Sequence, residues 1–512
     1  ATTSTAAGDS DYNLFLTKHS PSGNLLWFKT IGNNYAQLSA CVRIGPANEV
    51  YFTGTFYQKT DFDPTTAVDT LNSAGKAGCF ISQYDASGNY ISTRLLEGVQ
   101  IISDIVFRPN GEILVTGYTG GSLADVDFSG SVYSLSIPAY AQHAFVLRYT
   151  SSWGFLNAFS FGGAGLTPAF QDVNYSYDIA LDTNAVIVSG GFRGKCDFDP
   201  GIGNTNDSTA TTSGADYDMY FAKYDFNGTL IWKRTFGSTG GDYICNTQVL
   251  NGNIYVAARF EGTIDMDPSG STNNVVSNAS NDILFGRYDS NGNLLWIKSF
   301  GGDASAEYAS HISLQNDNIV LSGISYSLAL SGHGFDIDPG TGIDSIKSTN
   351  YSCPFAARYD LAGNYVASLN IDSTSYGYHC GHTCVGNAVY LAGYYKVNAN
   401  FDPGFSNYAV ASAGQDDAYL AKYEWTSSAI ADHASLPELN CFPNPTNGDL
   451  IISVSTRMHT IRVTDLSGKV VLNITGINAT SASLDLEKLT NGVYIMQVLT
   501  QTGTVSTRII KQ

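Results

Sequence analysis

The chain has 512 residues, which is too long for one ordinary single-core domain and predicts either several domains or one large repeat array. Its net charge of −19 argues against nucleic acid as a partner, because phosphate binding needs clustered Lys and Arg. No apolar run approaches the roughly 20 residues that span a bilayer, so we expect a protein that does not cross a membrane. Only 14% of residues are charged while 52 are Gly, a mixture typical of many short strands and tight turns.

Residues 1–10 precede the first strand pattern. The chain begins at Ala1 without Met, and we interpret this segment as the start of a mature protein after signal-peptide removal. An exported protein can oxidise neighbouring cysteines, and Cys380 and Cys384 are the nearest pair for a local disulfide. Free thiols are the alternative. A metal site that includes the flanking His379 and His382 is disfavoured, because ligands so close in sequence can hardly surround one ion tetrahedrally.

One pattern recurs along residues 11–425 and sets the architecture. Its clearest copies, residues 220–232 and 284–296, each contain an alternating run, an Asp/Ser/Asn/Gly turn and a second run, which is typical of a β-hairpin. A second pair of strand signals lies between successive hairpins, as at residues 243–260. Four strands per unit, repeated without helical patterning, predict a β-propeller.

A short acidic motif ends the second strand pair of each unit. Its six copies, Asp-x-Asp-Pro or close variants, start at Asp61, Asp125, Asp197, Asp265, Asp336 and Asn400. Six motifs predict a six-bladed propeller. The strand that carries the recurrent Tyr occurs seven times, because it is found at both ends of the repeat region, near residues 11–19 and near 416–423. Seven blades are therefore the alternative. A surplus or edge strand supplied by one terminus would explain the mismatch.

Two carboxylates two residues apart in a loop can both turn onto a hard cation, so the acidic motifs are candidate Ca²⁺ sites. The four complete pairs are Asp61 and Asp63, Asp197 and Asp199, Asp265 and Asp267, and Asp336 and Asp338. The alternative is a structural corner, in which Asp accepts backbone N–H groups, the apolar residue packs between blades and Pro ends the strand. Sixfold recurrence favours the corner. No cofactor is required, and Ca²⁺ is the one that the pattern suggests.

No Ser/His/Asp arrangement, phosphate loop or nucleophile elbow is recognisable, so we assign no catalytic residue. We prefer a binding or adhesion module over a polysaccharide-active or protein-active enzyme, and a structural subunit of an extracellular assembly is a further alternative. Tyrosines at recurrent positions are expected to pack between blades. Less periodic aromatic residues are better candidates for a face that binds a glycan or a surface protein. These candidates are Trp153, Tyr175, Tyr177, Tyr376 and Tyr378.

The units resemble the bacterial SBBP-type β-propeller repeats, with their Asn-x-Tyr-Val-x-Gly strand and Phe-x-x-Lys-Tyr-Asp-x-x-Gly-Asn hairpin. The resemblance covers residues 11–425. It implies a fold and little function, because propellers host both binding sites and enzymes.

After Trp425 the repeat stops, and residues 426–437 form a Ser/Ala-rich linker. Residues 438–512 contain seven short strand patterns separated by Gly- and Asn-containing turns. This arrangement predicts a small seven-stranded Ig-like β-sandwich.

This C-terminal module resembles the type A C-terminal sorting domain of the type IX secretion system of Bacteroidota. The matching segments are residues 442–448, 463–470, 489–494 and 508–511. The resemblance places the sorting signal at Pro443, Asn444, Pro445, Gly448, Asp465, Gly468, Gly492, Tyr494 and Lys511. It implies recognition by the type IX translocon and its outer-membrane shuttle protein, export across the outer membrane, and retention at the cell surface after the module is removed.

Overall fold

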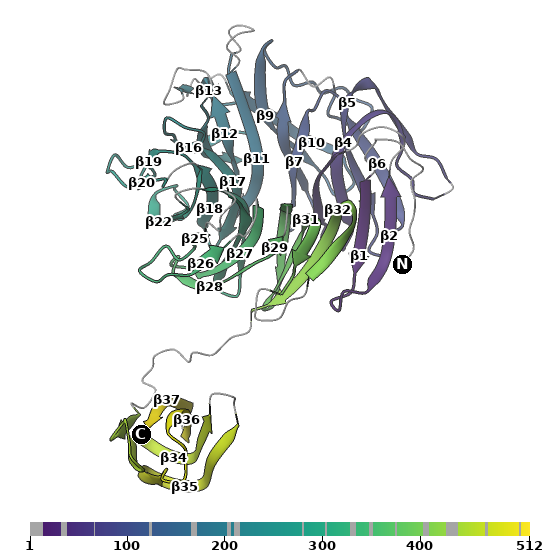
Figure 1. Ribbon diagram of the computed structural model, residues 1–512. Helices are drawn as coiled ribbons and strands as arrows, with labels where there is room; N and C mark the ends of the chain where they lie inside the picture. Colours follow the sequence, from purple (N-terminus) through teal and green to yellow (C-terminus); the bar gives the residue numbers. More distant parts are fainter. Residues whose placement is uncertain are drawn as a thin grey trace. The chain divides into compact units, whose positions relative to one another are not determined.

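The computed structural model describes residues 14–31, 38–65, 67–121, 125–164, 172–201, 206–208, 216–278, 281–302, 305–327, 334–347, 352–373, 376–402, 409–425, 439–465, 469–500 and 503–512. These residues form strands and turns and no helix, which confirms the all-β class (Figure 1). None of them therefore belongs to a helix that could cross a membrane. The chain divides into two compact units directly after Trp425. The predicted N-terminal segment (residues 1–10) and linker (residues 426–437) lie outside the described residues.

The first unit contains a repeated set of four antiparallel strands that follow chain order, and a short parallel pairing joins the second and third sets into one ten-stranded sheet. The first repeat is β3 (Leu38–Ile44), β4 (Val50–Asp61), β5 (Thr70–Tyr84) and β6 (Tyr90–Leu96). Repeat 2 is β7 (Ile101–Phe107), β8 (Ile113–Thr119), β9 (Ala141–Tyr149) and β10 (Phe155–Gly162), and repeat 3 is β11 (Asp172–Asp182), β12 (Ala185–Arg193), β15 (Asp218–Asp225) and β16 (Leu230–Phe236). Repeat 4 is β17 (Tyr243–Leu250), β18 (Asn253–Phe260), β21 (Asp282–Tyr288) and β22 (Leu294–Phe300), and repeat 5 is β23 (Ser305–Gln315), β24 (Asn318–Ser327), β27 (Ser352–Asp360) and β28 (Tyr365–Asn370).

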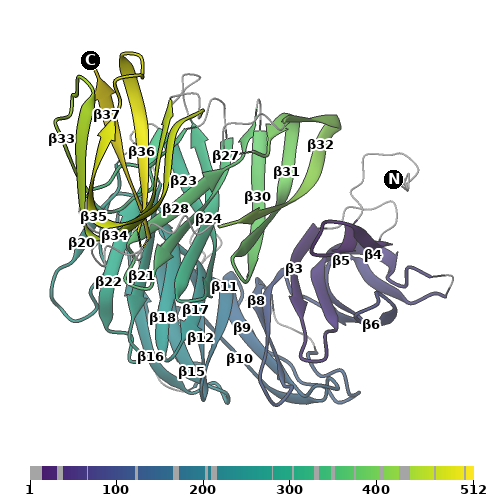
Figure 2. The same ribbon diagram turned by 90° about the horizontal axis from the view of Figure 1, so that it is seen from below.

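Both ends of this unit depart from the pattern. Repeat 6 has β30 (Tyr376–Val385), β31 (Ala388–Asn400) and β32 (Ala409–Glu424), with the short β29 (Asp372–Ser373) on β31. At the other end, β1 (Leu14–His19) and β2 (Leu25–Ile31) form a two-stranded sheet. Figure 2 shows the repeats of this unit following one another around a common centre.

The apolar core lies between the sheets, because the inner strands are apolar on both faces. In β18, Ile254 and Val256 pack in one layer with repeat 3, whereas Tyr255 and Ala257 pack in the next layer with repeat 5. Among the described residues, five such layers join successive repeats, and a sixth joins the β1–β2 hairpin to repeat 1. Each sheet therefore depends on its neighbours for burial of its side chains.

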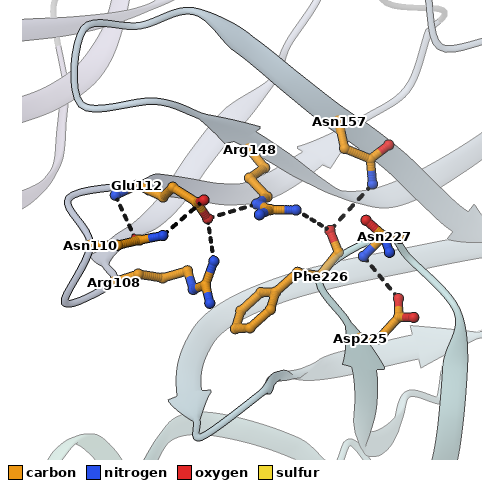
Figure 3. Close-up of polar contacts among 8 residues, drawn as sticks. All are labelled: Arg108, Asn110, Glu112, Arg148, Asn157, Asp225, Phe226 and Asn227. Carbon is orange, nitrogen blue, oxygen red and sulfur yellow. Dashed lines mark hydrogen bonds and ion pairs between the residues drawn. The ribbon is translucent and has the colours of Figure 1, made fainter.

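A cation on the third strand of a repeat reaches the hairpin turn of the next repeat. Arg148 on β9 donates Nη1 to the carbonyl of Phe226 at 3.2 Å, and Asn157 donates to the same carbonyl at 3.4 Å (Figure 3). Arg108 lies over the Phe226 ring, 3.7 Å from its centroid. Glu112 accepts from Arg148 and Arg108, and these bonds lower the pKa of Glu112 to about 2. The resulting network fixes the spacing of repeats 2 and 3.

The acidic motifs come after the second strands, and three of them start at the last residue of the first strand of a short hairpin. These hairpins are β13 (Lys195–Asp197) with β14 (Asn206–Ser208), β19 (Thr263–Asp265) with β20 (Asn274–Val276), and β25 (Gly334–Asp336) with β26 (Ser345–Lys347).

The recurrent tyrosine of the third strand bonds to the middle of the acidic motif. The Tyr288 hydroxyl donates to the Met266 carbonyl at 3.1 Å, and its ring packs on Phe221 of the preceding repeat at 4.9 Å. The same bond joins Tyr149 to Val126 (2.8 Å), Tyr224 to Phe198 (2.8 Å), Tyr359 to Ile337 (2.9 Å) and Tyr423 to Phe401 (2.9 Å). These tyrosines pack between repeats, as the sequence predicts.

The described residues of the C-terminal unit form one five-stranded sheet, so the predicted seven-stranded sandwich is wrong in its strand number. Its strands are β33 (Asn440–Phe442), β34 (Asp449–Asp465), β35 (Val470–Asp485), β36 (Gly492–Thr500) and β37 (Gly503–Lys511). Two strands, β34 and β35, each continue through two predicted segments, because register shifts between Ser453 and Thr460 bend the pair without ending it. Val454 and Met458 at this bend are buried in the core of the unit.

We expect Tyr288→Phe to lower the free energy of unfolding of the first unit by about 1 to 2 kcal/mol, because it leaves the Met266 carbonyl without its donor. All five tryptophans precede residue 426, so tryptophan fluorescence during denaturation reports on this unit alone. The matched control is Tyr84→Phe, because the Tyr84 hydroxyl occupies the same position in repeat 1 but does not bond to a carbonyl of the acidic motif. Equal losses in the two variants would contradict the assigned role of the hydroxyl.

Candidate functional site

The acidic motifs form hydrogen-bonded corners. Asp265 Oδ1 accepts from the backbone N–H groups of Asp267 (3.0 Å) and Asn273 (2.9 Å), and Asp267 Oδ1 accepts from Ser269 (2.8 Å). Met266 between them is fully buried in the layer between repeats 3 and 4. These contacts are those of the structural corner that the sequence analysis favours.

The other acidic motifs make the same contacts. Asp61 accepts from Asp63 (3.1 Å) and Asp69 (3.0 Å), Asp63 from Thr65 (2.9 Å), Asp197 from Asp199 (3.1 Å), Asp199 from Gly201 (2.9 Å), Asp336 from Asp338 (3.1 Å) and Asp344 (2.9 Å), and Asp338 from Gly340 (2.7 Å). In the part of the chain that the structure describes, no three His, Cys, Asp or Glu side chains are grouped to hold a metal ion. Ca²⁺ binding at these loops stays a prediction.

Cys380 and Cys384 are free thiols on β30, the first exposed and the second half-buried. Four residues of extended strand span about 13 Å. A disulfide needs Cα atoms within about 7 Å, so this strand keeps the two thiols apart.

Nine tyrosines gather at one end of the inner hairpins of repeats 2 to 6, and we call them the tyrosine belt. They are Tyr118, Tyr175, Tyr177, Tyr217, Tyr243, Tyr308, Tyr326, Tyr378 and Tyr394. Antiparallel pairing places the start of each first strand beside the end of the second, and Tyr378 and Tyr394 are directly opposite each other in the β30–β31 register. All nine side chains are half-buried.

The belt is continuous from repeat 2 to repeat 6. Its ring-centroid distances are 4.4 Å for Tyr118–Tyr175, 5.7 Å for Tyr175–Tyr217, 5.0 Å for Tyr217–Tyr243, 5.4 Å for Tyr308–Tyr326, 6.1 Å for Tyr326–Tyr378 and 4.5 Å for Tyr378–Tyr394. Arg259 bridges the remaining step, because its guanidinium lies 4.3 Å from the Tyr243 centroid and 4.9 Å from that of Tyr308. Burial raises the pKa of Tyr243 and Tyr394 to about 12, so their hydroxyls are donors at neutral pH.

The belt includes three of the five aromatic candidates from the sequence, Tyr175, Tyr177 and Tyr378. Trp153 was a wrong candidate: it is 4% exposed and donates to Gln83 at 3.3 Å inside the layer between repeats 1 and 2. The side chain of Tyr376 lies outside the described residues.

A cavity of about 600 Å³ is lined by residues from the first strands of all six repeats, including Arg43, Asp104, Asn246, His311 and His382. Several of these polar side chains follow a β-bulge in their strand. No sequence motif marks this cavity, because its lining comes from short stretches about one repeat apart.

Polar bonds join neighbouring first strands around the cavity. Asp178 Oδ2 accepts from the Thr247 N–H at 2.6 Å, and Asn246 Oδ1 accepts from the Ile312 N–H at 3.0 Å. Each residue follows a bulge, which turns its side chain toward the next repeat. The bulges therefore allow a side chain on the first strand of one repeat to bond to the next repeat.

A buried pair of carboxyl groups extends these bonds to repeats 1 and 2. Asp104 forms an ion pair with Arg43 at 2.7 Å and shares a hydrogen bond with Asp178. Burial, followed by the charge of Asp104, raises the pKa of Asp178 well above its ordinary range. The two side chains belong to residues that are only 3% and 2% exposed.

Three histidines, His311, His379 and His382, lie on the first strands of repeats 5 and 6. His382 contacts the hydroxyls of Ser322 (2.5 Å) and Ser313 (2.7 Å), and His379 contacts Ser322 at 2.7 Å. The His311 ring lies 6.1 Å from that of His382. Burial lowers the pKa of His311 to about 4 and that of His379 to about 3, so both are neutral at pH 7.

In the C-terminal unit, the segment after β33 packs along the last strand. Asn444 donates Nδ2 to the Arg508 carbonyl at 2.7 Å and accepts from the Ile510 N–H at 2.9 Å. Pro443 and Pro445 on either side of it both follow cis peptide bonds. The predicted proline-rich motif therefore holds the end of β37.

Other predicted sorting residues lie around the same strand. Lys511 is opposite Gly492 in the β36–β37 register and is 7% exposed. Tyr494 donates to the Thr490 carbonyl at 2.7 Å and is opposite Asp465 in the β34–β36 register. Gly468 lies outside the described residues.

Two further contacts complete this site. Thr446, which the sequence analysis did not single out, donates its hydroxyl to the Asp449 carbonyl at 2.6 Å and its backbone N–H to the Ile510 carbonyl at 2.8 Å. The hydroxyl of Thr446 also accepts from the N–H of Gly448 at 3.1 Å.

Residues 440–512 match the family described as the secretion system C-terminal sorting domain. The chain is a cargo of the type IX secretion system. This cargo is therefore exported to the outside of the cell, and its C-terminal unit is the part that interacts with the secretion machinery.

The chain is also similar to a viral protein. The WD repeat-containing protein L264 of Acanthamoeba polyphaga mimivirus is 23% identical over 408 residues, covering 69% of this chain and 29% of the viral protein. The chain thus spans less than a third of the length of this curated relative.

Two solved structures show similarity at about a tenth of positions. The extracellular domain of the one-component system BT4673 from B. thetaiotaomicron is 10% identical and covers 98% of each chain, with a TM-score of 0.19. The core factor of S. cerevisiae is 9% identical and covers 84% of this chain and 64% of its own, with a TM-score of 0.29. Both scores are too low to support an argument about the fold.

We expect His311→Gln to weaken the pH dependence of stability of the cargo. A histidine whose pKa is about 4 when folded and about 6.5 when unfolded stabilises the fold above pH 6.5, and this stability is lost as pH falls toward 4. Between pH 7 and pH 5, the wild type should lose about 2 kcal/mol more than the variant, measured by tryptophan fluorescence. His19→Gln, at the surface of the β1–β2 hairpin, is the control. An unchanged pH profile in His311→Gln would contradict the prediction.

We expect Asn444→Ala to loosen the last strand of the sorting domain, because two hydrogen bonds to β37 are lost. Hydrogen exchange of residues 503–512 in the full chain should become about tenfold faster, measured by mass spectrometry. The matched control is Asn473→Ala, at an exposed position of β35. Unaltered exchange in Asn444→Ala would show that the motif does not hold the strand.

Proposed function

We propose that the first unit is a six-bladed β-propeller that binds a neutral glycan on its tyrosine-belt face at the cell exterior. The propeller assignment is supported by six repeats whose first strands all line one cavity. The similarity to a WD repeat-containing protein supports it further, because WD repeats are propeller repeats.

The tyrosine belt is the observation that carries the binding proposal. Tyrosines offer large rigid faces with few rotatable bonds, and each hydroxyl donates a hydrogen bond at neutral pH. Ring contacts hold the side chains in place, so little conformational entropy is lost on binding. An extended ligand could contact several repeats at once, because the belt is continuous across five of them.

The charge of the protein favours a neutral ligand. With a net charge of −19, the protein repels polyanions. Two arginines beside the belt already contact its rings, because Arg193 stacks on Tyr217 and Arg259 stacks on Tyr243. Sugar hydroxyls can pair with tyrosine hydroxyls, while the sugar ring packs on an aromatic face. A surface protein is the alternative ligand.

Binding is favoured over catalysis by the use of the carboxyl groups in the cavity. Asp104 is the carboxyl side chain among the lining residues that the structure describes, and both Asp104 and its neighbour Asp178 are engaged in bonds between repeats. A glycosidase needs two carboxyl groups that reach a substrate on opposite sides of one bond. Neither side chain is exposed enough to do so.

The C-terminal unit directs export of the protein. Its sorting residues lie around β36 and β37, which we propose as the surface for the translocon and its shuttle protein. Retention at the cell surface and removal of the module would follow export. Intact-mass measurement of surface material that still included residues 503–512 would contradict the removal.

We expect Tyr175→Ala and Tyr217→Ala each to weaken glycan binding at least about tenfold, since each deletes a stacking face. Candidates from a glycan array screen of the exported protein would be measured by calorimetry. Tyr57→Ala is the matched control, because Tyr57 is 42% exposed on β4 outside the belt. Product release instead of simple binding would support the enzyme alternative, and equal affinity in all three variants would overturn the belt as the binding face.

A further inference from the structure

Among the described residues, the chain has one more third strand than it has first or second strands. β1 and β32 both have the third-strand pattern: Leu16 and Leu420 correspond to Phe221 of β15, and Lys18 and Lys422 correspond to Lys223. Six first strands and six second strands are described for these seven third strands. One of the terminal third strands is therefore surplus in a ring of six repeats.

The β1–β2 hairpin contacts repeat 1 as a preceding repeat would. Lys18 donates to the Ala86 carbonyl at 2.6 Å, and Trp27 donates to the same carbonyl at 3.5 Å. The equivalent residues of repeat 3 donate to the Ser290 carbonyl of repeat 4, Lys223 at 3.1 Å and Trp232 at 3.3 Å. Leu16 is 6% exposed in the layer with repeat 1.

β32 lacks these contacts. Leu420 is 51% exposed, whereas Phe221 and Phe285 at the same position of other repeats are fully buried. Lys422 donates to Glu424 of its own strand at 2.7 Å. β32 therefore completes the pairing of β31 without packing on a following repeat.

β1, by contrast, packs on the following repeat but, among the described residues, has no second strand paired with it. Phe15 is 51% exposed, whereas Tyr220 and Leu284 at the same position are fully buried beside their second strands. Among the described residues, β1 pairs with β2 alone, so its other edge has no strand. An open edge of this kind is a template for another strand.

We propose that β1 and β32 are alternative third strands of repeat 6, and that the closed form of the propeller is β30–β31–β1–β2. In this form the hairpin keeps its contacts with repeat 1 and gains a second strand, so Phe15 becomes buried. The register of β31 with β32 sets Leu391 opposite Ala421 and therefore opposite Thr17 in the closed form. The exchange thus buries Phe15, pairs the open edge of β1 and releases β32.

Release of β32 lengthens the connection to the sorting domain. β32 has 16 residues and is followed directly by the connection that leads into the second unit. The exchange is thus a conformational switch that couples closure of the propeller to the freedom of the C-terminal unit. This inference does not depend on the glycan proposal.

Disulfide trapping in the full-length protein tests the exchange. Thr17→Cys with Leu391→Cys should form an intramolecular disulfide under mild oxidation, identified by peptide mass spectrometry. Leu391→Cys with Ala421→Cys is the matched pair for the alternative strand, so both variants share one core substitution. Disulfides between two copies, or trapping of the Ala421 pair alone, would overturn the proposal.

A third substitution biases the equilibrium and guards against a variant that fails to fold. Proline at position 421 weakens strand pairing of β32, so Ala421→Pro should raise the yield of the Thr17–Leu391 disulfide several-fold. Tryptophan fluorescence checks that the first unit stays folded. A yield that stays the same or falls in this folded variant would overturn the competition between the two strands.

Discussion

The apolar residues on both faces of each inner sheet are the constraint on which the first unit depends. A strand such as β18 sends Val256 into one layer and Ala257 into the next, so its sheet has no face that tolerates water. Successive repeats must therefore stack, and the stack must either close or leave a face unsatisfied at each end. The exposed Phe15 and Leu420 lie at those two ends.

The polar contacts of the molecule follow from this stacking. Sheets that pack face to face bring the hairpin turn of one repeat beside the third strand of the previous one, where Arg148 bonds to Phe226. The same packing brings bulged first strands together, so Asp178 bonds to a backbone N–H that lies 69 residues away at Thr247. Buried groups of this kind must be paired, because an unsatisfied donor or acceptor costs more than a typical bond contributes. The tyrosine belt forms at the ends of these same strands.

The C-terminal unit has its own core, and its recognition motifs support one another. Asn444 near its start holds β37 at its end, and Tyr494 lies between Asp465 and Ile509 in the register of the sheet. Residues of the sorting signal are therefore part of the fold that is recognised. The export signal therefore lies in a unit with a core separate from that of the first unit.

The sequence alone determined the all-β class, the repeat, the corner role of the acidic motifs and the export route, because each depends on local patterns that recur or match within a few residues. It also indicated Tyr175, Tyr177 and Tyr378, which lie outside the third-strand position of the packing tyrosines. Only the tertiary structure decided that β34 continues through a bend, that Trp153 is buried, and that Asp104 meets Asp178 beside Arg43. Those outcomes depend on contacts between residues that are distant in the chain, about one repeat apart in the first unit, and no local pattern specifies which residues will meet at that distance.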